Sequence, residues 1–316
     1  ILGGNKMDIL ALIAAFGGGA FAAGLGALPA FIMTGFLALV GTGITLAGGV
    51  DILTSNLAFG SFFGPHIAFA GAAAATAYAA RKNNTLIAST SFECGEVALT
   101  LEEGILIDGT DITYSLGKTL DGTVLIVGGV FGMIGYLVNY LYSGVLHLNT
   151  DTVAMTVATL GLIARFTIGK SGLTGQYTGT EKRQYFSQNQ ELIYNIVVGL
   201  SVGIMVSCVA AYLKNLGVSK EFLIAGYPSL CFGISAITLV FAQMGFSVPI
   251  THHISLPAAN AAVLSGNPII GVVVAIACSL IGDFFTKTIN SYVDTHIDPP
   301  ACTIFLMEFI VFGLFM

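Results

Sequence analysis

The chain has 316 residues, of which 55% are apolar and only 9% are charged, and its formal net charge is -6. Since roughly 25% of the residues in an ordinary soluble domain are charged, this composition excludes a soluble globular fold. Lysine and arginine are too few and too scattered to follow a phosphate backbone, which excludes a nucleic-acid partner. The five cysteines have no CxxC or other metal-binding spacing, and we interpret them as small core residues.

The apolar residues recur in blocks of about 20, the length with which an α-helix crosses roughly 30 Å of hydrocarbon. They do not alternate with polar residues as the strands of a membrane barrel do. The first block, from Ile9, lacks the basic region and the cleavage site of a signal peptide, so we expect it to be retained in a chain that starts naturally at Met7. The sequence thus predicts an all-α integral membrane protein with helical spans at residues 8–28, 30–49, 123–143, 152–169, 191–213, 221–243, 269–290 and 300–316.

Two further apolar segments, 57–80 and 248–265, are interrupted by proline, notably at Pro65 and at Pro257. We expect a helix to restart beside each of these prolines, because proline suits a first helical turn and Ser255 has a side chain that can cap the second restart. Non-helical backbone inside a membrane is tolerated only where protein or a water-filled cavity satisfies it. The sequence therefore predicts a central polar cavity with one half-site from each broken segment.

Three sequence matches in the same order indicate an internal duplication. Residues 66–75 match 253–262 at an offset of 187, residues 133–135 with Asp151 match 280–282 with Asp298 at an offset of 147, and residues 31–39 match 222–230 at an offset of 191. The first two offsets differ by 40 residues, which equals the length of a hydrophilic stretch in the first half only. We expect two homologous repeats of about four full spans plus one broken or re-entrant helix each, 8 to 10 transmembrane helices in total.

The expected domains are a first membrane repeat at 7–169, a polar linker at 170–190 and a second membrane repeat at 191–316. An extramembrane insert at 81–121 interrupts the first repeat. Its short apolar runs at 85–88, 97–101 and 105–107 alternate with Glu, Gly and Asp, so the insert is predicted to be a small β-rich loop.

The distribution of positive charge bears on whether the broken segments cross the membrane. If they dip in and return, seven basic residues lie on one side against two on the other; if they cross, the ratio is six to three. The positive-inside rule then favours eight spans, parallel repeats and cytoplasmic termini. Ten spans in two inverted repeats of five, an arrangement common in transporters, remain the alternative.

Polar residues beside the breaks are candidates for binding a solute, since an ionisable side chain in a span is costly. His66 and His253 occupy matching repeat positions, and His252 adjoins the second. Histidine can hydrogen-bond a solute or transfer a proton near neutral pH, although a lone histidine is commonly structural. Asn260, one turn beyond Leu256, and Ser255 complete the predicted substrate-binding set.

A second group of residues is predicted to form an ion or proton pathway. Asp151 and Asp298 precede the last span of each half, where each is expected to cap a helix and could also bind a cation or proton at a pore mouth. Asp283 and Lys287 are spaced to pair on one helical face, with Thr286 beside them.

The chain has no HExxH, GxSxG, P-loop or GxGxxG motif in a suitable setting, so we expect no enzyme, no metal site and no cofactor. The predicted function is a secondary transporter or channel for a small solute or ion, in the cell (inner) membrane. A non-catalytic subunit or anchor of a larger complex and an intramembrane enzyme are the alternatives. The expected partners are the lipid bilayer and the solute, and self-association into a homo-oligomer is left open.

Overall fold

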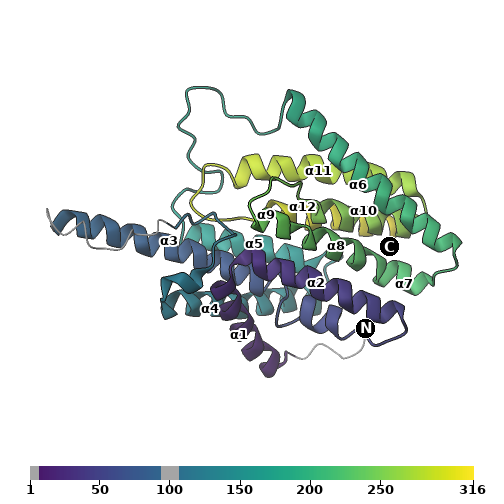
Figure 1. Ribbon diagram of the computed structural model, residues 1–316, viewed down its shortest axis with the longest axis horizontal. Coiled ribbons are helices and arrows are strands. Elements are labelled where there is room, and N and C mark those ends of the chain that lie inside the picture. The colour runs from purple at the N-terminus through teal and green to yellow at the C-terminus, as the bar shows by residue number, and fades with distance from the viewer. Residues whose placement is uncertain (1–6, 94–106) are drawn as a thin grey trace.

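The computed structural model describes residues 7–93 and 107–316, and within them every regular element is a helix (Figure 1). The α-helices are α1 (Ile9–Leu25), α2 (Ala27–Leu46), α3 (Ala68–Glu93), α4 (Gly122–Asn139), α5 (Thr152–Thr167), α6 (Asn189–Asn215), α7 (Lys220–Ala225), α8 (Tyr227–Ile237), α9 (Leu239–Gln243), α10 (His252–Ser265), α11 (Pro268–Ile289) and α12 (Pro299–Phe315). Two π-helical segments, η1 (Leu53–Ala58) and η3 (Tyr140–Val145), and one 3-10 segment, η2 (Leu116–Thr119), complete the set. Helices occupy all eight predicted spans.

Four helical segments of the described chain are long and apolar enough to cross a membrane: Ala27–Leu46, Gly122–Val145, Asn189–Asn215 and Pro268–Ile289. The outer surface is apolar as well. On α6, for example, Ile193, Val197, Leu200 and Ile204 are exposed at helical spacing along one face. A stripe of large apolar side chains facing outward is typical of a helix in contact with lipid. The chain is therefore a helical membrane protein.

Glycine allows the closest contacts between helices. A Cβ atom on Gly19 of α1 would lie 2.3 Å from the carbonyl oxygen of Gly128 of α4, so only glycine fits there. Gly199 and Gly203 of α6 meet Ala275 of α11 in the same manner. Close backbone approach through small residues is how helices associate in a membrane, where no hydrophobic force drives them together.

The helix pairs recur in both halves of the chain. In the first half α4 packs on α1, α3 and α5; in the second half α11 packs on α6, α10 and α12. The halves contact each other through α2 with α8 and α9 and through α5 with α12.

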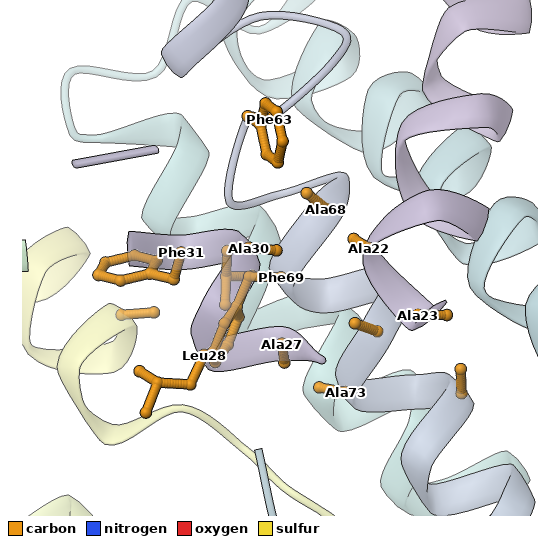
Figure 2. Packing of buried hydrophobic residues seen from close by; sticks show 14 of the residues in the cluster. Ala22, Ala23, Ala27, Leu28, Ala30, Phe31, Phe63, Ala68, Phe69 and Ala73 are labelled. Carbon is orange, nitrogen blue, oxygen red and sulfur yellow. The ribbon is translucent and has the colours of Figure 1, made fainter. Parts of the chain in front are cut away.

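The first broken segment folds back along α2. Thr34 donates a hydrogen bond to the carbonyl of Phe63 at 2.6 Å, which holds the loop beside the middle of that helix. The amide of Ala68 donates to the Gly64 carbonyl at 2.8 Å, so Pro65 occupies a first helical turn as predicted. Figure 2 shows this loop between Phe63 and Ala68, leading into α3. From there α3 runs outward until it extends beyond the other helices (Figure 1).

The second broken segment begins its helix earlier than predicted. Residues 244–251 contain no helix, and α10 starts at His252 rather than beside Pro257. Ser255 therefore does not cap a restart; its hydroxyl accepts from Ser235 at 2.9 Å and lies 3.3 Å from the Cys231 carbonyl. Pro257 lies inside α10, where its missing N–H cannot donate to the carbonyl four residues earlier.

The expected β-rich insert differs from the observed structure where it is described. Residues 85–88 belong to α3, not to a strand. They directly continue an alanine-rich helix, in which each added residue gains a hydrogen bond, whereas a lone strand has no pairing partner. Residues 97–101 lie outside the described part of the chain, and 107–121 form turns and η2, with no strand.

The helices have two ends, which we call end A and end B. End A is defined by residues 107–121, 168–188 and 290–297, and end B by residues 47–52, 215–219 and 266–267. At end A, Lys82 of α3 pairs with Asp121, and Gln243 of α9 donates to the carbonyl of Thr113 at 3.1 Å. The Lys82 side chain, through its hydrogen bond, holds the pKa of the Asp121 carboxyl below its ordinary value.

Asp294 closes end A from the other side. Its carboxylate accepts from the Lys170 amide at 2.6 Å and from the Ser171 hydroxyl at 2.6 Å. Partial burial acts to raise the pKa of Asp294, but these hydrogen bonds outweigh burial and hold the pKa below its ordinary value.

Candidate functional site

A cavity of about 210 Å³ lies where the beginnings of four helices meet. Its lining includes Pro65 at the start of α3, Asp151 at the start of α5, His252 at the start of α10 and Asp298 at the start of α12. We call it the central cavity. A buried water needs only about 10–15 Å³ of such volume, so this space is large enough for a small solute.

Both aspartates cap their helices, as predicted. Asp151 accepts a hydrogen bond from the Ala154 amide at 2.8 Å, and Asp298 accepts from the Ala301 amide at 2.8 Å. The second oxygen of Asp298 lies 3.3 Å from His296 Nε2. Because both carboxylates also line the central cavity, capping and contact with a solute are compatible roles.

Aromatic rings form much of the remaining wall. Phe31, Phe59, Phe69 and Phe232 line the cavity together with His252. The ring of Phe31 is central to this group: its centroid lies 4.7 Å from that of His252, 5.5 Å from that of Phe232 and 5.7 Å from that of Phe69. Such tilted and edge-to-face contacts fix the rings in place, so the apolar wall is preorganised.

The charges around the central cavity nearly balance. Each helix N-terminus carries the equivalent of roughly +0.5 charge, and four of them converge here. The carboxylates of Asp151 and Asp298 together offset about that amount. A cavity with aromatic walls and balanced polar groups fits a small solute with an apolar body and polar or zwitterionic groups.

A second cavity of about 210 Å³ opens toward end A, between α6, α11 and the segment before α10. Glu191, Asn195, His253, Asp283 and Thr286 are among the residues that line it. We call it the end-A cavity. The first turn of α10 separates the two cavities, since His252 lines the central one and His253 lines the other, with ring centroids 5.8 Å apart.

His66 lies at neither cavity. The His66 side chain is buried. The backbone carbonyl oxygen of His66 packs so closely against Gly135 that a Cβ atom on Gly135 would lie 1.8 Å from it. His253 packs against a glycine of α11 in a similar way, with Gly282 Cβ placed 2.6 Å from Nε2. The structure thus brings His252 and His253 to the cavities and leaves His66 in the helix packing.

The predicted pair of Asp283 and Lys287 is wrong. Asp283 accepts from the Ser187 amide at 2.7 Å and from the Ser187 hydroxyl at 2.6 Å, whereas Lys287 pairs with Glu191 at 3.0 Å. The chain just before α6 and the first turn of α6 lie over the end of α11, so Ser187 and Glu191 are better-placed partners for Asp283 and Lys287. Thr286 donates within its own helix, to the Gly282 carbonyl at 2.8 Å.

Asn260 reaches a residue that the sequence analysis missed. Its Nδ2 donates to Glu308 Oε1 of α12 at 2.7 Å, and Glu308 is fully buried. The signal was present, because Glu308 is the sole charged residue in the predicted span 300–316. Arg165, the sole charged residue of the span 152–169, was missed in the same way.

Among residues 7–93 and 107–316, no group of three or more His, Cys, Asp or Glu side chains is arranged to hold a metal ion. The lining of the central cavity combines two carboxylates and a histidine with aromatic and aliphatic side chains, which suit hydrogen bonding and apolar contact. No curated protein and no solved structure matches the chain. One family model, described as "Family of unknown function (DUF7973)", matches residues 2–186 and again residues 184–316. The chain belongs to this DUF7973 family.

Proposed function

We propose that this protein is a membrane transport protein that moves a small solute through the central cavity. The observation that carries the proposal is that residues at corresponding positions of the two halves line the cavity. Three pairs are 147 positions apart, namely Asp151 with Asp298, Ala154 with Ala301 and Val157 with Ile304, and two are 187 apart, namely Pro65 with His252 and Phe69 with Leu256. A site on the axis between two repeats is typical of secondary transporters.

The proposal includes an internal duplication with inverted repeats. The pairing of α1 with α4 in the first half corresponds to that of α6 with α11 in the second. The two matches to one family model, which meet near residue 185, support the same division, within the predicted linker. The contact between the halves is also reciprocal: a Cβ on Gly35 would lie 3.2 Å from the Gly233 carbonyl oxygen, and one on Gly233 would lie 3.0 Å from that of Gly35.

The course of the broken segments supports ten spans over eight. From Pro65 at the cavity, α3 runs to end A, where Arg81 donates to the Ile168 carbonyl at 2.7 Å. From His252 at the cavity, α10 runs the opposite way, to Gly266 beside Lys214 at end B. These opposite courses support helices that continue across the membrane in opposite directions, and we therefore propose ten spans in two inverted repeats in preference to the re-entrant, parallel arrangement.

Charge then orients the molecule. Eight basic residues lie at end A, whereas Lys214 and Lys220 lie at end B. The eight are Arg81 and Lys82 of α3, Arg165 and Lys287 in the last turns of α5 and α11, and Lys118, Lys170, Lys182 and Arg183. By the positive-inside rule we assign end A to the cytoplasm. The C-terminus of α12 then lies on the opposite side, not in the cytoplasm as expected from eight spans.

A cavity-filling substitution tests the function. Purified protein in liposomes is assayed for uptake of a panel of small radiolabelled amino acids, nucleobases and polyols. Ala301→Phe places a ring in the central cavity and is expected to lower uptake at least about tenfold, which corresponds to roughly 1.4 kcal/mol of lost binding. The matched control is Ala14→Phe on the exposed face of α1.

Elution as a single symmetric peak establishes that both variants fold. Wild-type uptake that survives in Ala301→Phe at the level of Ala14→Phe would show that the solute does not pass through the central cavity. No uptake of any solute by the wild-type protein would contradict transport itself.

A further inference from the structure

Glu308 and Asn260 form a buried polar pair one helical turn from the central cavity. Ile304 and Leu256 line that cavity, and Glu308 and Asn260 follow them by four residues on α12 and α10. Residues four apart lie on the same helix face, so the pair lies one turn further along the two helix faces that line the cavity. Glu308 Oε1 accepts from Asn260 Nδ2 at 2.7 Å.

The other carboxyl oxygen of Glu308 has no protein partner. Oε2 is buried and makes no hydrogen bond within the described residues. Three elements pack on this part of α12. These are α10, which carries Asn260, α11, which carries Cys278, and α5, which begins after Asp151. Asp151 and Cys278 interact electrostatically with Glu308.

None of these neighbours supplies positive charge. Within residues 7–93 and 107–316 no lysine, arginine or histidine forms an ion pair with Glu308. A carboxylate buried among apolar side chains and close to a second acidic group is strongly disfavoured relative to the neutral acid. When Oε2 carries a proton, Oε1 accepts the hydrogen bond from Asn260. The Oε2–H group is then a donor at the site where the described residues offer Oε2 no partner.

We propose that Glu308 is a proton-binding site that loads and releases a proton during transport. The coupling to solute rests on the proposed function of the central cavity, whereas proton binding itself does not. The step is an acid dissociation, in which the O–H bond of the carboxylic acid breaks and the proton passes to water that reaches the site from the cavity. The negative charge left on Glu308 faces Asp151, so release requires that water or solute enter next to both.

A proton fits the site better than a metal cation does. Hard cations need several oxygen ligands, often including backbone carbonyls of unwound helix. Cys278, which interacts electrostatically with Glu308, belongs to a buried apolar cluster with Ile254, Ala258 and Met307. The amide of Asn260 presents its donor, not its oxygen, to the carboxyl group.

Infrared difference spectroscopy of the full-length protein in lipid nanodiscs tests this directly. The wild-type protein is expected to show, at neutral pH, the carbonyl stretch of a protonated carboxylic acid, with a shift in D₂O and a loss at alkaline pH. Glu308→Gln is expected to remove this band, and Glu181→Gln, in an exposed loop, to leave it unchanged. Asn260→Leu should keep the band and change its frequency, because it removes the donor to Oε1.

A wild-type spectrum without a protonated carboxyl band at neutral pH would refute the assignment, as would a band that Glu308→Gln leaves in place. A band lost on addition of sodium ions at constant pH would identify a sodium site instead and also overturn it.

Uptake driven by a pH gradient is measured in parallel. A Glu308-dependent band without uptake of any solute would support proton binding and contradict transport. Uptake that depends on the central cavity, in a protein without the band, would support transport and contradict proton binding at Glu308.

Discussion

Single glycines decide how closely the helices of this protein pack, and Gly135 is the tightest case among the residues that the structure describes. A Cβ atom at Gly135 would lie 1.8 Å from the His66 carbonyl oxygen, whereas one at Gly17 of α1 would have no atom within 4 Å. We expect Gly135→Ala to destabilise the protein by about 1–3 kcal/mol through overpacking. Gly17→Ala should stabilise it by about 0.5–1 kcal/mol, because glycine costs conformational entropy inside a helix.

Thermal unfolding followed by circular dichroism in detergent measures both effects. The melting temperature is expected to fall for Gly135→Ala and to rise slightly or stay constant for Gly17→Ala. Equal melting temperatures would mean that the backbone near His66 moves aside without cost, and the tight packing would then have no role in stability.

The success of prediction for single residues depended on how far away the partner lay in the sequence. The capping roles of Asp151 and Asp298 were predictable because the acceptor and donor are three residues apart. The partner of Asp283 is 96 residues away, and no local pattern could reveal it. Glu308 carried a local signal, a lone charge in an apolar span, but its partner Asn260 is 48 residues distant.

Helices and loops are joined at end A through Arg165 of α5. Its side chain is almost fully buried, and its guanidinium donates to five oxygen atoms in residues 172–173, Ile289 and Thr295. The guanidinium thereby fastens α5 to the loop between α11 and α12. This arrangement uses every N–H of the group, which an ammonium with three donors cannot do.

We expect Arg165→Ala to lower the free energy of unfolding by about 3 kcal/mol or more, since hydrogen bonds to charged groups each contribute about 1.5–3 kcal/mol. Arg165→Lys should recover only part of this loss. Lys118→Ala, at an exposed position of end A, is the matched control and should change little. Urea unfolding in detergent measures all three; a lysine variant as stable as wild type would contradict the role of the fork-shaped guanidinium.

Helix positions were predictable from apolar block length, but the broken segments were only partly so. Pro65 marked a helix start correctly because the loop before it contains glycine and is held by α2. Pro257 misled the prediction, because α10 is stabilised by packing on α6, α8, α11 and α12 and tolerates a proline in its interior. The residues of 85–88 extend α3 for a local reason, the strong helix propensity of the stretch before them.

For the molecule as a whole, the sequence indicated two related halves but not their relative orientation. The choice between eight and ten spans depended on the side assigned to a single basic residue. Gly35, which the sequence match pairs with Gly226, packs against Gly233 across the two halves. Apolar helices resemble one another too closely for sequence alone to fix register, and only contacts across the molecule distinguish the alternatives.

The inverted arrangement predicts which loops share a side of the membrane. In a variant whose five cysteines are replaced by alanine, single cysteines are introduced at Val50, Glu181 and Lys220, all of which are exposed. Ten spans place Val50 and Lys220 together at end B and Glu181 at end A. Eight spans with re-entrant segments would instead place Val50 with Glu181, opposite Lys220.

Labelling of intact cells with a membrane-impermeant maleimide distinguishes these cases. Because end A carries most of the positive charge, we expect Val50→Cys and Lys220→Cys to react from outside and Glu181→Cys to react only after the membrane is permeabilised. If only Lys220→Cys reacts from outside, the parallel, re-entrant arrangement with eight spans would be correct and the inverted one wrong. The central cavity would then lose its place on an axis between opposed helices, because α3 and α10 would enter the membrane from the same side and could not supply matching walls from opposite directions.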